Sequence, residues 1–326
     1  MTNASPRLLA SDDAGIQIAA DRIRSGGVVA FPTETVYGLG ASTLNASALR
    51  IVYEMKGRPQ NNPLIAHVVD AVEARKLVAW WDVRCSRLAA AFWPGPLTLI
   101  LPRADGVPDE AVAGRTTIAV RSPMHPVARS LLYAVGGPVS APSANRSGHI
   151  SPTTSEHVMR DFASADDLLV LEGGRVEFGI ESTVLDLSGD RPTILRPGSV
   201  TAEDLSRHIG AVDSPEVMEQ GASPGTNLIH YAPDTPATMV PAARLAAFLA
   251  ALQTPAAVLA MPDTRVSEPH IAIRMQPDAK GYARMLYACL REAEACGLSQ
   301  IVIEEPSGRD GVWLAVLDRL RRATVR

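Results

Sequence analysis

The chain has 326 residues, of which 46% are hydrophobic and 20% are charged, and its formal net charge at pH 7 is −4. These values are typical of a globular protein with one large domain and a smaller one. The acidic balance argues against a free-standing nucleic-acid binder, whose affinity depends on a basic face. No run approaches the roughly 18 apolar residues of a membrane span, and the N-terminus lacks a basic-then-apolar signal pattern, so we expect a cytoplasmic protein.

The hydrophobic pattern predicts alternating helices and strands over the first part of the chain. Helical spacing of apolar residues predicts a helix over 16–23 that ends at Gly26, followed by a strand over 27–31. Further helices are predicted over 44–53, 71–79, 85–92 and 127–135, and strands over 63–69, 96–102, 116–121, 168–171, 182–187 and 193–195. This alternation predicts an α/β fold with a mixed sheet and flanking helices.

Turn and linker residues interrupt this pattern between about residue 210 and residue 236. We therefore divide the chain into a first domain (1–212), a linker (213–236) and a second domain (237–326). In the second domain, helices are predicted over 245–252, 277–297 and 311–323, and strands over 256–261 and 300–304. Strand and helix alternate there as in a small Rossmann-like domain, but without a G-x-G-x-x-G motif, so no dinucleotide site is expected.

The three cysteines indicate neither a disulfide framework nor a zinc site. Cys85, Cys289 and Cys296 form no Cys-x-x-Cys pair. We expect all three to be buried and to pack as small hydrophobic residues. Neither a His-Glu-x-x-His motif nor an EF-hand pattern occurs, so no metal site made by the protein alone is expected.

A candidate site follows the predicted strand over 27–31. Residues 32–40 read Pro-Thr-Glu-Thr-Val-Tyr-Gly-Leu-Gly, a loop with several hydroxyl groups and two glycines that allow a close backbone approach. Lys56 and Arg58 follow shortly and supply positive charge. The sequence therefore predicts a site that handles an anion such as phosphate or carboxylate.

Three more polar segments, 140–148, 179–183 and 195–198, are candidates for the same site. Taken singly, each is more commonly a turn than a binding site. The chain has no G-x-x-x-x-G-K-[ST] motif, so a nucleotide would not bind through a P-loop, and it has no G-x-S-x-G motif for a serine nucleophile.

Together, however, the polar segments stand in the order found in YrdC-type proteins. The matching segments are 32–40, 56–59, 62–64, 143–145, 181–184, 196–198 and 230–233, with similar segments in the second domain at 286–293 and 318–323. These motifs extend over nearly the whole chain. In them the chain resembles the two-domain form of the L-threonylcarbamoyladenylate synthase family. The resemblance implies a YrdC-like twisted mixed sheet followed by a smaller Rossmann-like domain.

The resemblance implies a nucleotidyltransferase. L-Threonine, bicarbonate or CO2 and ATP, with Mg2+, would give threonylcarbamoyl-AMP and pyrophosphate, which a tRNA-modifying threonylcarbamoyl transferase would use downstream. Direct tRNA binding would be weak or absent, and no membrane would be involved. Because the carbamate oxygen of threonine would itself attack, the protein would position its substrates and stabilise charge, without a covalent nucleophile.

The resemblance also implies the roles of individual residues. Threonine is expected to contact Thr35, His67, Arg121, Ser143 and Ser182, with Arg121 binding its carboxylate. ATP is expected to contact Lys56, Arg58, Asn62, Thr117, Asn145, Ser151, Arg196, His230 and Tyr231. Lys56 and Arg58 are the expected catalytic cations, and His230 and Tyr231 belong to a linker that is expected to close as a lid.

Other interpretations stay open at this point. From the sequence alone, His67 in an apolar strand is more commonly structural, and Glu34 and Glu181 beside hydroxyl residues are more commonly structural acceptors than general bases. The linker also departs from the family pattern, because residues 226–228, Thr-Asn-Leu, replace Met-Lys-Tyr and so lack a cation and an aromatic ring. The alternatives are a carbamoyl-adenylate-dependent carbamoyltransferase and a non-catalytic RNA-binding module; the acidic excess before residue 236 counts against the second.

Overall fold

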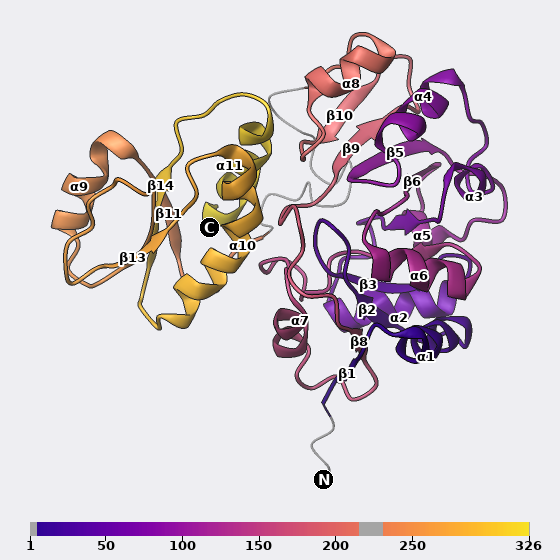
Figure 1. Cartoon of the computed structure of the whole chain (residues 1–326), viewed down its shortest axis with the longest axis horizontal. Helices are drawn as coiled ribbons and strands as arrows, with labels where there is room; N and C mark the ends of the chain where they lie inside the picture. Colours follow the sequence, from indigo (N-terminus) through magenta and orange to yellow (C-terminus); the bar gives the residue numbers. More distant parts are fainter. Residues whose placement is uncertain (1–4, 215–230, 326) are drawn as a thin grey trace.

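A computed structural model describes residues 5–214 and 231–325 of the chain. These residues form two α/β domains that lie side by side, each built on its own sheet (Figure 1). The α/β class predicted from the sequence, with a large mixed sheet and a smaller second domain, is confirmed. Across the described residues, every helix is too short or too polar to span a bilayer.

The first domain is built on a ten-stranded sheet with the order β1-β8-β2-β3-β7-β4-β6-β5-β9-β10. Its strands are β1 (Arg7–Leu9), β2 (Val29–Phe31), β3 (Gly38–Ser42), β4 (Ile65–His67), β5 (Leu97–Pro102), β6 (Thr117–Arg121), β7 (Val139–Ser140), β8 (Leu169–Leu171), β9 (Thr183–Asp186) and β10 (Thr193–Arg196). Its helices are α1 (Asp13–Arg24), α2 (Ala46–Lys56), α3 (Ala71–Arg75), α4 (Val83–Phe92), α5 (Asp109–Val112), α6 (Pro126–Val135), α7 (Ser155–Asp161) and α8 (Ala202–Ile209).

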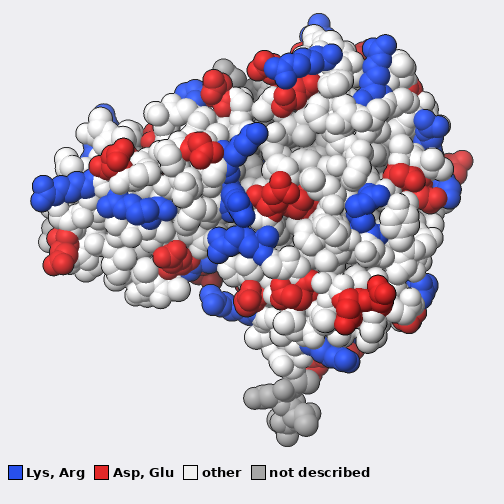
Figure 2. Space-filling view, in the orientation of Figure 1, with Lys and Arg blue, Asp and Glu red and all other residues white. Residues whose placement is uncertain are grey.

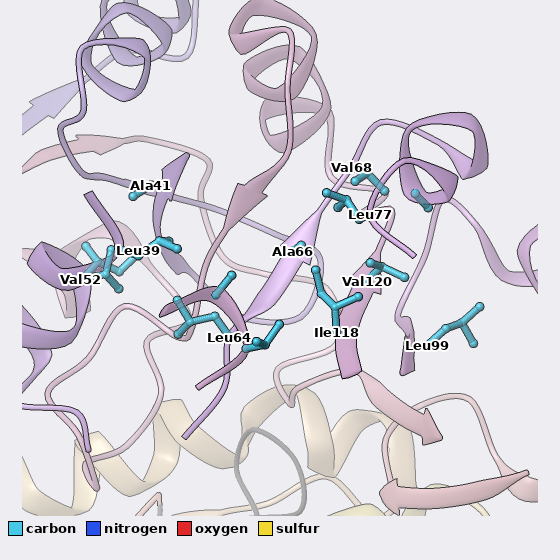
Figure 3. Packing of buried hydrophobic residues seen from close by; sticks show 14 of the residues in the cluster. Leu39, Ala41, Val52, Leu64, Ala66, Val68, Leu77, Leu99, Ile118 and Val120 are labelled. Atoms are coloured by element: carbon cyan, nitrogen blue, oxygen red, sulfur yellow. The ribbon is translucent and has the colours of Figure 1, made fainter. Parts of the chain in front are cut away.

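Alternation along the strands divides the apolar residues between the two faces of this sheet. In β2, Ala30 belongs to the large core on one face, whereas Val29 and Phe31 belong to the core beneath α1 and α6 on the other. Figure 3 shows the large core, where side chains from β3, β4, β5 and β6 pack with Val52 of α2. The opposite face of β4 and β6 carries a small apolar cluster around Ile65, which leaves room for polar side chains beside it.

The first two strands after α1 form a hairpin, which corrects part of the sequence-based interpretation. That interpretation places residues 38–40 in a loop, but β3 begins at Gly38 and runs antiparallel to β2, with Val29 opposite Gly40. A Cβ on Gly40 would lie 2.6 Å from the Phe31 ring and 2.8 Å from a Val139 methyl group. This glycine is therefore required by packing between strands and not by the approach of a ligand.

The second domain is built on a four-stranded parallel sheet with the order β11-β14-β12-β13. Its elements are β11 (Ala237–Pro241), α9 (Ala242–Ala251), β12 (Ala257–Ala260), β13 (Ile271–Arg274), α10 (Ala279–Ala295), β14 (Ile301–Glu305) and α11 (Val312–Thr324). In β12, Ala257 and Leu259 pack with α10 and α11, whereas Val258 and Ala260 pack with α9. Helices therefore cover both faces of the sheet, as in Rossmann-like domains.

The cysteines are free thiols. Cys85 and Cys289 are buried as expected, but the prediction is wrong for Cys296, which is half-buried at the C-terminal end of α10. Burial raises the pKa of the Cys85 thiol to about 12 and that of the Cys289 thiol to about 11. Both therefore stay protonated, as expected of packing residues. In the part of the chain that the structure describes, His, Cys, Asp and Glu side chains form no group of three or more that could hold a metal ion.

The face of the second domain formed by α10 and α11 packs against the first domain (Figure 1). One buried apolar cluster contains Val36, Ile150 and Ile180 of the first domain together with residues of α10 and α11. At Gly179, where φ is +74°, a Cβ would lie 2.5 Å from the Cα of Arg284 in α10. The two domains thus share a hydrophobic core and touch through their backbones.

We predict that Gly179→Ala lowers the free energy of unfolding by roughly 3 kcal/mol, because its Cβ would meet the α10 backbone at a positive φ. Gly136→Ala is the matched control, since Gly136 has a φ of +72° but no neighbouring atom within 4 Å of the place that a Cβ would take. That control should lose only about 1 kcal/mol. Urea unfolding of both variants measures the difference, and equal losses would contradict a tight contact at Gly179.

Candidate active site

A cavity of about 50 Å³ lies on the polar face of the first sheet, beside the turn between β2 and β3. It is lined by Thr33, Thr35, Val36, Gly38, Arg58, Ile65, His67, Arg121, Ala141, Pro142, Ser143, Glu181, Ser182, Arg196 and Tyr231. Most of these side chains are polar or charged, although nearly all are buried. Convergent buried polar groups of this kind indicate a site for a small polar ligand.

Strand alternation brings the first two site residues together. Leu64 and Ala66 face the large core, so His67 faces the opposite side of the sheet. In the parallel pairing of β4 with β6, His67 is opposite Arg121. Two residues that are far apart in the sequence therefore become neighbours on the wall of the cavity.

Arg121 is held by a carboxylate from the turn between β2 and β3. Its Nη2 lies 2.6 Å from Glu34 Oε1, its Nη1 donates to Thr35 Oγ1 at 3.0 Å, and its Nε donates to the Gly95 carbonyl at 3.2 Å. The other oxygen of Glu34 accepts from the Met124 backbone at 3.1 Å. Glu34 is thus a structural acceptor, and a ligand carboxylate at Arg121 would share the guanidinium with it.

His67 is a neutral side chain in this site. Its Nδ1 lies 3.1 Å from the Ile65 carbonyl, and its ring lies nearly perpendicular to the Phe31 ring, with the ring centroids 6.1 Å apart. Burial, followed by the nearby charge of Arg121, lowers the pKa of His67 to about 3. A ligand would therefore meet His67 as a hydrogen-bonding group and not as a cation.

Arg58 is a cation whose partners in the fold are carbonyl groups. Its Nε donates to the Asn62 carbonyl at 3.1 Å and its Nη2 to the Pro63 carbonyl at 2.9 Å. Burial lowers the pKa of Arg58 to about 10, which still leaves it charged at neutral pH. Because these partners carry no formal charge, Arg58 brings positive charge to the cavity wall.

Lys56 has a different position from Arg58. Its Nζ donates to the Ser143 carbonyl at 2.6 Å and also to the Asn145 carbonyl, and within the described residues it is not part of the cavity lining. Burial and the charge of Arg58 hold the pKa of Lys56 well below its usual range. Lys56 therefore fixes the loop that carries Ser143 and Asn145, and its direct contact with ATP stays a prediction.

Arg196 and Ser182 form the side of the cavity contributed by β9 and β10. Arg196 donates from Nε to the Ser182 carbonyl at 3.1 Å and from Nη2 to the Ser182 hydroxyl at 3.2 Å. That hydroxyl also lies 2.7 Å from Thr98 Oγ1. Burial lowers the pKa of Arg196 from its usual value. Ser182 thus presents its side chain to the cavity in a position that hydrogen bonds with Arg196 and Thr98 fix.

The structure separates the expected ligand contacts into two groups. Lining the cavity are Thr35, Arg58, His67, Arg121, Ser143, Ser182, Arg196 and Tyr231. Lys56, Asn62, Thr117, Asn145 and Ser151 lie elsewhere in the described part of the chain, and His230 lies outside the described residues. Thr117 is at the far end of β6, about 13 Å along the strand from Arg121. The binding roles of both groups stay predictions.

Two buried amides carry unused hydrogen-bonding groups. Within the described residues, neither side-chain polar atom of Asn62 has a partner, and Asn145 Oδ1 has none. The Nδ2 of Asn145 is used, since it donates to the His149 carbonyl at 2.7 Å. Buried polar groups are normally paired, so these amide atoms indicate a place where a ligand supplies the partners.

Residues from the second domain support the cavity wall from behind, and sequence reasoning missed them. Arg319 of α11 donates from Nε to Glu181 Oε2 at 2.9 Å, and the Tyr287 hydroxyl of α10 donates to the same oxygen at 2.9 Å. The other oxygen of Glu181 accepts from Ser151 at 2.6 Å. The only sequence signal for Arg319 and Tyr287 was their place in the two C-terminal segments that resemble the family.

Glu181 is a permanently ionised carboxylate in this arrangement. Burial alone would raise its pKa, but the charges of Arg319 and Arg196 and the hydrogen bonds from Ser151 and Arg319 lower it to about 2. A carboxylate that ionises so readily is a poor general base near neutral pH. Glu181 therefore acts as an acceptor that fixes its neighbours.

Comparisons with known proteins show the family to which this fold belongs. Residues 21–198 match the family model described as "Telomere recombination" (Sua5, YciO and YrdC), and residues 200–325 match the C-terminal domain of threonylcarbamoyl-AMP synthase. Threonylcarbamoyl-AMP synthase of Pyrococcus abyssi is 36% identical over 320 residues, which cover 95% of this chain and 94% of that protein. The Bacillus subtilis enzyme of the same name is 43% identical over 233 residues, which cover 70% of this chain and 67% of that protein.

A solved structure agrees with these relatives. The crystal structure of P. abyssi Sua5 complexed with L-threonine has a TM-score of 0.89 at 33% identity, and the match covers 98% of this chain and 97% of that one. The fold and the site thus define a two-domain α/β protein with a YrdC-type first domain. The chain belongs to the threonylcarbamoyl-AMP synthase family, and the sequence-based prediction of a nucleotidyltransferase that forms threonylcarbamoyl-AMP is confirmed.

We predict that His67 makes the protein less stable in acid. Its folded-state pKa of about 3 lies below the ordinary value of 6.5, so the unfolded chain binds a proton that the folded one does not. Stability is therefore full above pH 6.5 and falls toward pH 3, by on the order of 1 kcal/mol per pH unit. His67→Gln should flatten this dependence, whereas the exposed control His208→Gln should not. Urea unfolding at several pH values tests this, and parallel curves for all three proteins would contradict it.

Proposed function

We propose that the chain forms threonylcarbamoyl-AMP from L-threonine, bicarbonate or CO2 and ATP at this cavity. The observation that carries the proposal is the charge pattern of the cavity wall. Glu34 is paired with Arg121, and Glu181 is paired with Arg319, whereas Arg58 has carbonyl partners. The wall therefore holds positive charge at Arg58 for an anion, beside a separate group of hydrogen-bonding side chains.

The inner part of the cavity is the proposed threonine subsite. Arg121 would bind the carboxylate, and Thr35, His67, Ser143 and Ser182 offer hydrogen-bonding groups for the amine and hydroxyl. Ile65 and Ala141 add an apolar patch for the methyl group. The presence of L-threonine in the related P. abyssi structure supports this assignment.

ATP is proposed to bind across the outer part of the site. At about 50 Å³ the cavity is much smaller than a typical ligand pocket of several hundred Å³, so the nucleotide must extend beyond it. Arg58 and Arg196 would meet the phosphates, and the unpartnered amide atoms of Asn62 and Asn145 would bind polar atoms of the nucleotide. Ser151 and Lys56 would hold this region from behind.

The proposed reaction needs positioning and charge stabilisation. The amine of threonine adds to CO2 and releases a proton, and an oxygen of the carbamate then forms a bond to the α-phosphorus while the bond to pyrophosphate breaks. Negative charge moves onto the leaving pyrophosphate, where Arg58 would stabilise it. The side chains around His67 and Tyr231 are buried, so water is excluded from the labile product.

Mg2+ is proposed to arrive with the nucleotide. The two carboxylates of the cavity, Glu34 and Glu181, are both engaged in ion pairs, and among the described residues no cluster of three acidic or imidazole side chains occurs. This fits an ion held by phosphate oxygens and water with few protein ligands. When bound, Mg2+ would neutralise part of the phosphate charge.

The proposed consumer of the product is a tRNA-modifying threonylcarbamoyl transferase. On the face shown in Figure 2, several basic side chains lie in a row where the two domains meet, acidic side chains lie beside them and over the rest of the face, and the overall charge is −4. A mixed surface of this kind favours weak tRNA binding and disfavours the RNA-binding alternative. The carbamoyltransferase alternative is tested by the dependence of turnover on threonine.

We predict that pyrophosphate release requires L-threonine and falls at least about a hundredfold in Arg58→Ala, because a charged group at the leaving phosphates is lost. The control is Arg87→Ala, which removes an exposed arginine of α4 and should keep full activity. A coupled pyrophosphate assay with ATP, Mg2+ and bicarbonate measures both. Release that needs no threonine would overturn the substrate assignment, and an active Arg58→Ala would overturn the phosphate site.

We also predict that L-serine is used roughly 10- to 200-fold less efficiently than L-threonine, since one buried methyl group provides that much discrimination. Ile65→Ala should reduce this ratio, because Ile65 lines the cavity. Ile100→Ala is the control from the same apolar cluster and should leave the ratio unchanged. The kcat/KM values for L-threonine and L-serine test this prediction. A ratio that Ile65→Ala leaves unchanged would show that the methyl group of threonine does not contact Ile65.

A further inference from the structure

Two buried arginines of the second domain reach into the first domain near the proposed ATP subsite. Arg319 has no exposed surface and donates to Glu181. Arg291 of α10 binds both oxygens of Asp161, at 2.8 and 2.6 Å, and also donates to the Ile150 carbonyl at 2.6 Å. The adjoining Ser151 is hydrogen-bonded to Glu181. The segment 150–151 is therefore held from two sides by the second domain.

Arg319 also fixes an aromatic side chain of the cavity wall. Its guanidinium carbon lies 5.3 Å from the centre of the Tyr231 ring, and Tyr231 stacks on Tyr287 with centroids 5.6 Å apart and an interplanar angle of 29°. A cation over a tyrosine ring in a buried setting is attractive and restricts the ring. Tyr231 lines the cavity, whereas Arg319 and Tyr287 support it from behind.

The two oxygens of Glu181 connect these contacts. Oε1 accepts from Ser151, and Oε2 accepts from both Tyr287 and Arg319. Asp318 binds the other side of the Arg319 guanidinium at 2.6 Å, so the arginine is itself fixed. Within the described residues, Arg319 Nη2 has no hydrogen-bond partner, which leaves one buried donor next to this cluster.

We propose that Arg319 of the second domain is a positioning residue for the adenylation reaction: through Glu181 and Tyr231 it fixes Ser151 and the cavity wall in the geometry that ATP requires. The inference rests on the proposed function of the cavity. Arg319 acts through its neighbours and need not contact the substrates. It follows that the second domain is a structural part of the ATP subsite.

The choice of arginine follows from the geometry. A guanidinium can donate to Glu181 and Asp318 at the same time and still present a flat face to the Tyr231 ring. A lysine keeps the charge but offers a single ammonium group, and a methionine keeps the length but leaves the Glu181 carboxylate without its closest cation. Arg319→Lys and Arg319→Met therefore separate the loss of geometry from the loss of charge.

The test compares two arginines that both bridge the domains. Arg319→Met should raise the KM for ATP at least tenfold and lower kcat, while the KM for threonine changes less than threefold; Arg319→Lys should recover part of the loss. Arg291→Met removes an ion pair with Asp161, which does not line this cavity, and leaves the contacts of Glu181 with Arg319, Ser151 and Tyr287 in place, so it should lower Tm but raise the KM for ATP less than a third as much as Arg319→Met. If the rise in the KM for ATP is in the same proportion to the loss of Tm in both Met variants, Arg319 only holds the domains together and the proposal is overturned.

A pH profile provides a readout that a purely structural role would not change. Glu181 faces Arg319, Arg196, Tyr287 and Tyr231, and it stays ionised in the wild type because its pKa is about 2. Burial raises the pKa of Glu181, and without Arg319 this effect is opposed mainly by the charge of Arg196. The pKa of Glu181 is therefore higher in the variant. In Arg319→Met, kcat/KM for ATP should therefore fall on the acid side at a pH at least one unit higher than in the wild type. An unshifted acid limb would contradict the coupling through Glu181.

Tyr287→Phe provides a milder variant if Arg319→Met does not fold. It removes only the hydroxyl that donates to Glu181 and should raise the KM for ATP about two- to fivefold, with a smaller loss of Tm than in Arg319→Met; an unchanged KM would count against the proposal. Failure of the proposed function can be distinguished from failure of the positioning role. A wild type that releases no pyrophosphate overturns the function, whereas an active wild type matched by Arg319→Met and Tyr287→Phe overturns the positioning role alone.

Discussion

The buried ion pair between Glu181 and Arg319 is the interaction on which the joining of the two domains and the site depends. Its partners come from different domains, and the carboxylate also holds Ser151 and Tyr287. A buried pair of this kind adds little net stability, but removal of one partner typically costs about 3–5 kcal/mol, because a charge is left uncompensated. The pair therefore specifies one relative position of the domains more than it strengthens their contact.

The same rule of paired charges explains why the cavity can select an anion. Arg121 is fixed and neutralised by Glu34, so it can orient a carboxylate without attracting any anion indiscriminately. Arg58 is fixed by carbonyl groups instead, which orient its guanidinium but leave its charge for a ligand. Two arginines on one wall thus acquire different tasks from their partners and not from their own chemistry.

Much of the fold and part of the site could be predicted from the sequence because they depend on local patterns. Helices α1, α2, α6 and α10 follow from apolar spacing and end at glycines or turns, and the alternation in β4 and β6 places His67 and Arg121 on one face. The short strands β1, β7, β11 and β13 were missed, since segments of only a few residues carry too little periodicity. The hairpin at Gly38 was missed because the glycine that follows at position 40 is required by Phe31 and Val139, and Val139 is far away in the sequence.

The contribution of the second domain depends on contacts that no local pattern records. Arg319 stands among other arginines at the C-terminal end of α11, and in the sequence nothing distinguishes it from its exposed neighbour Arg321. Only the packing of α11 against the first domain places it within 2.9 Å of Glu181 and over the Tyr231 ring. Because an unpaired buried charge is costly, the burial of Arg319 and the burial of Glu181 depend on each other, and this pair ties the second domain to the wall of the site.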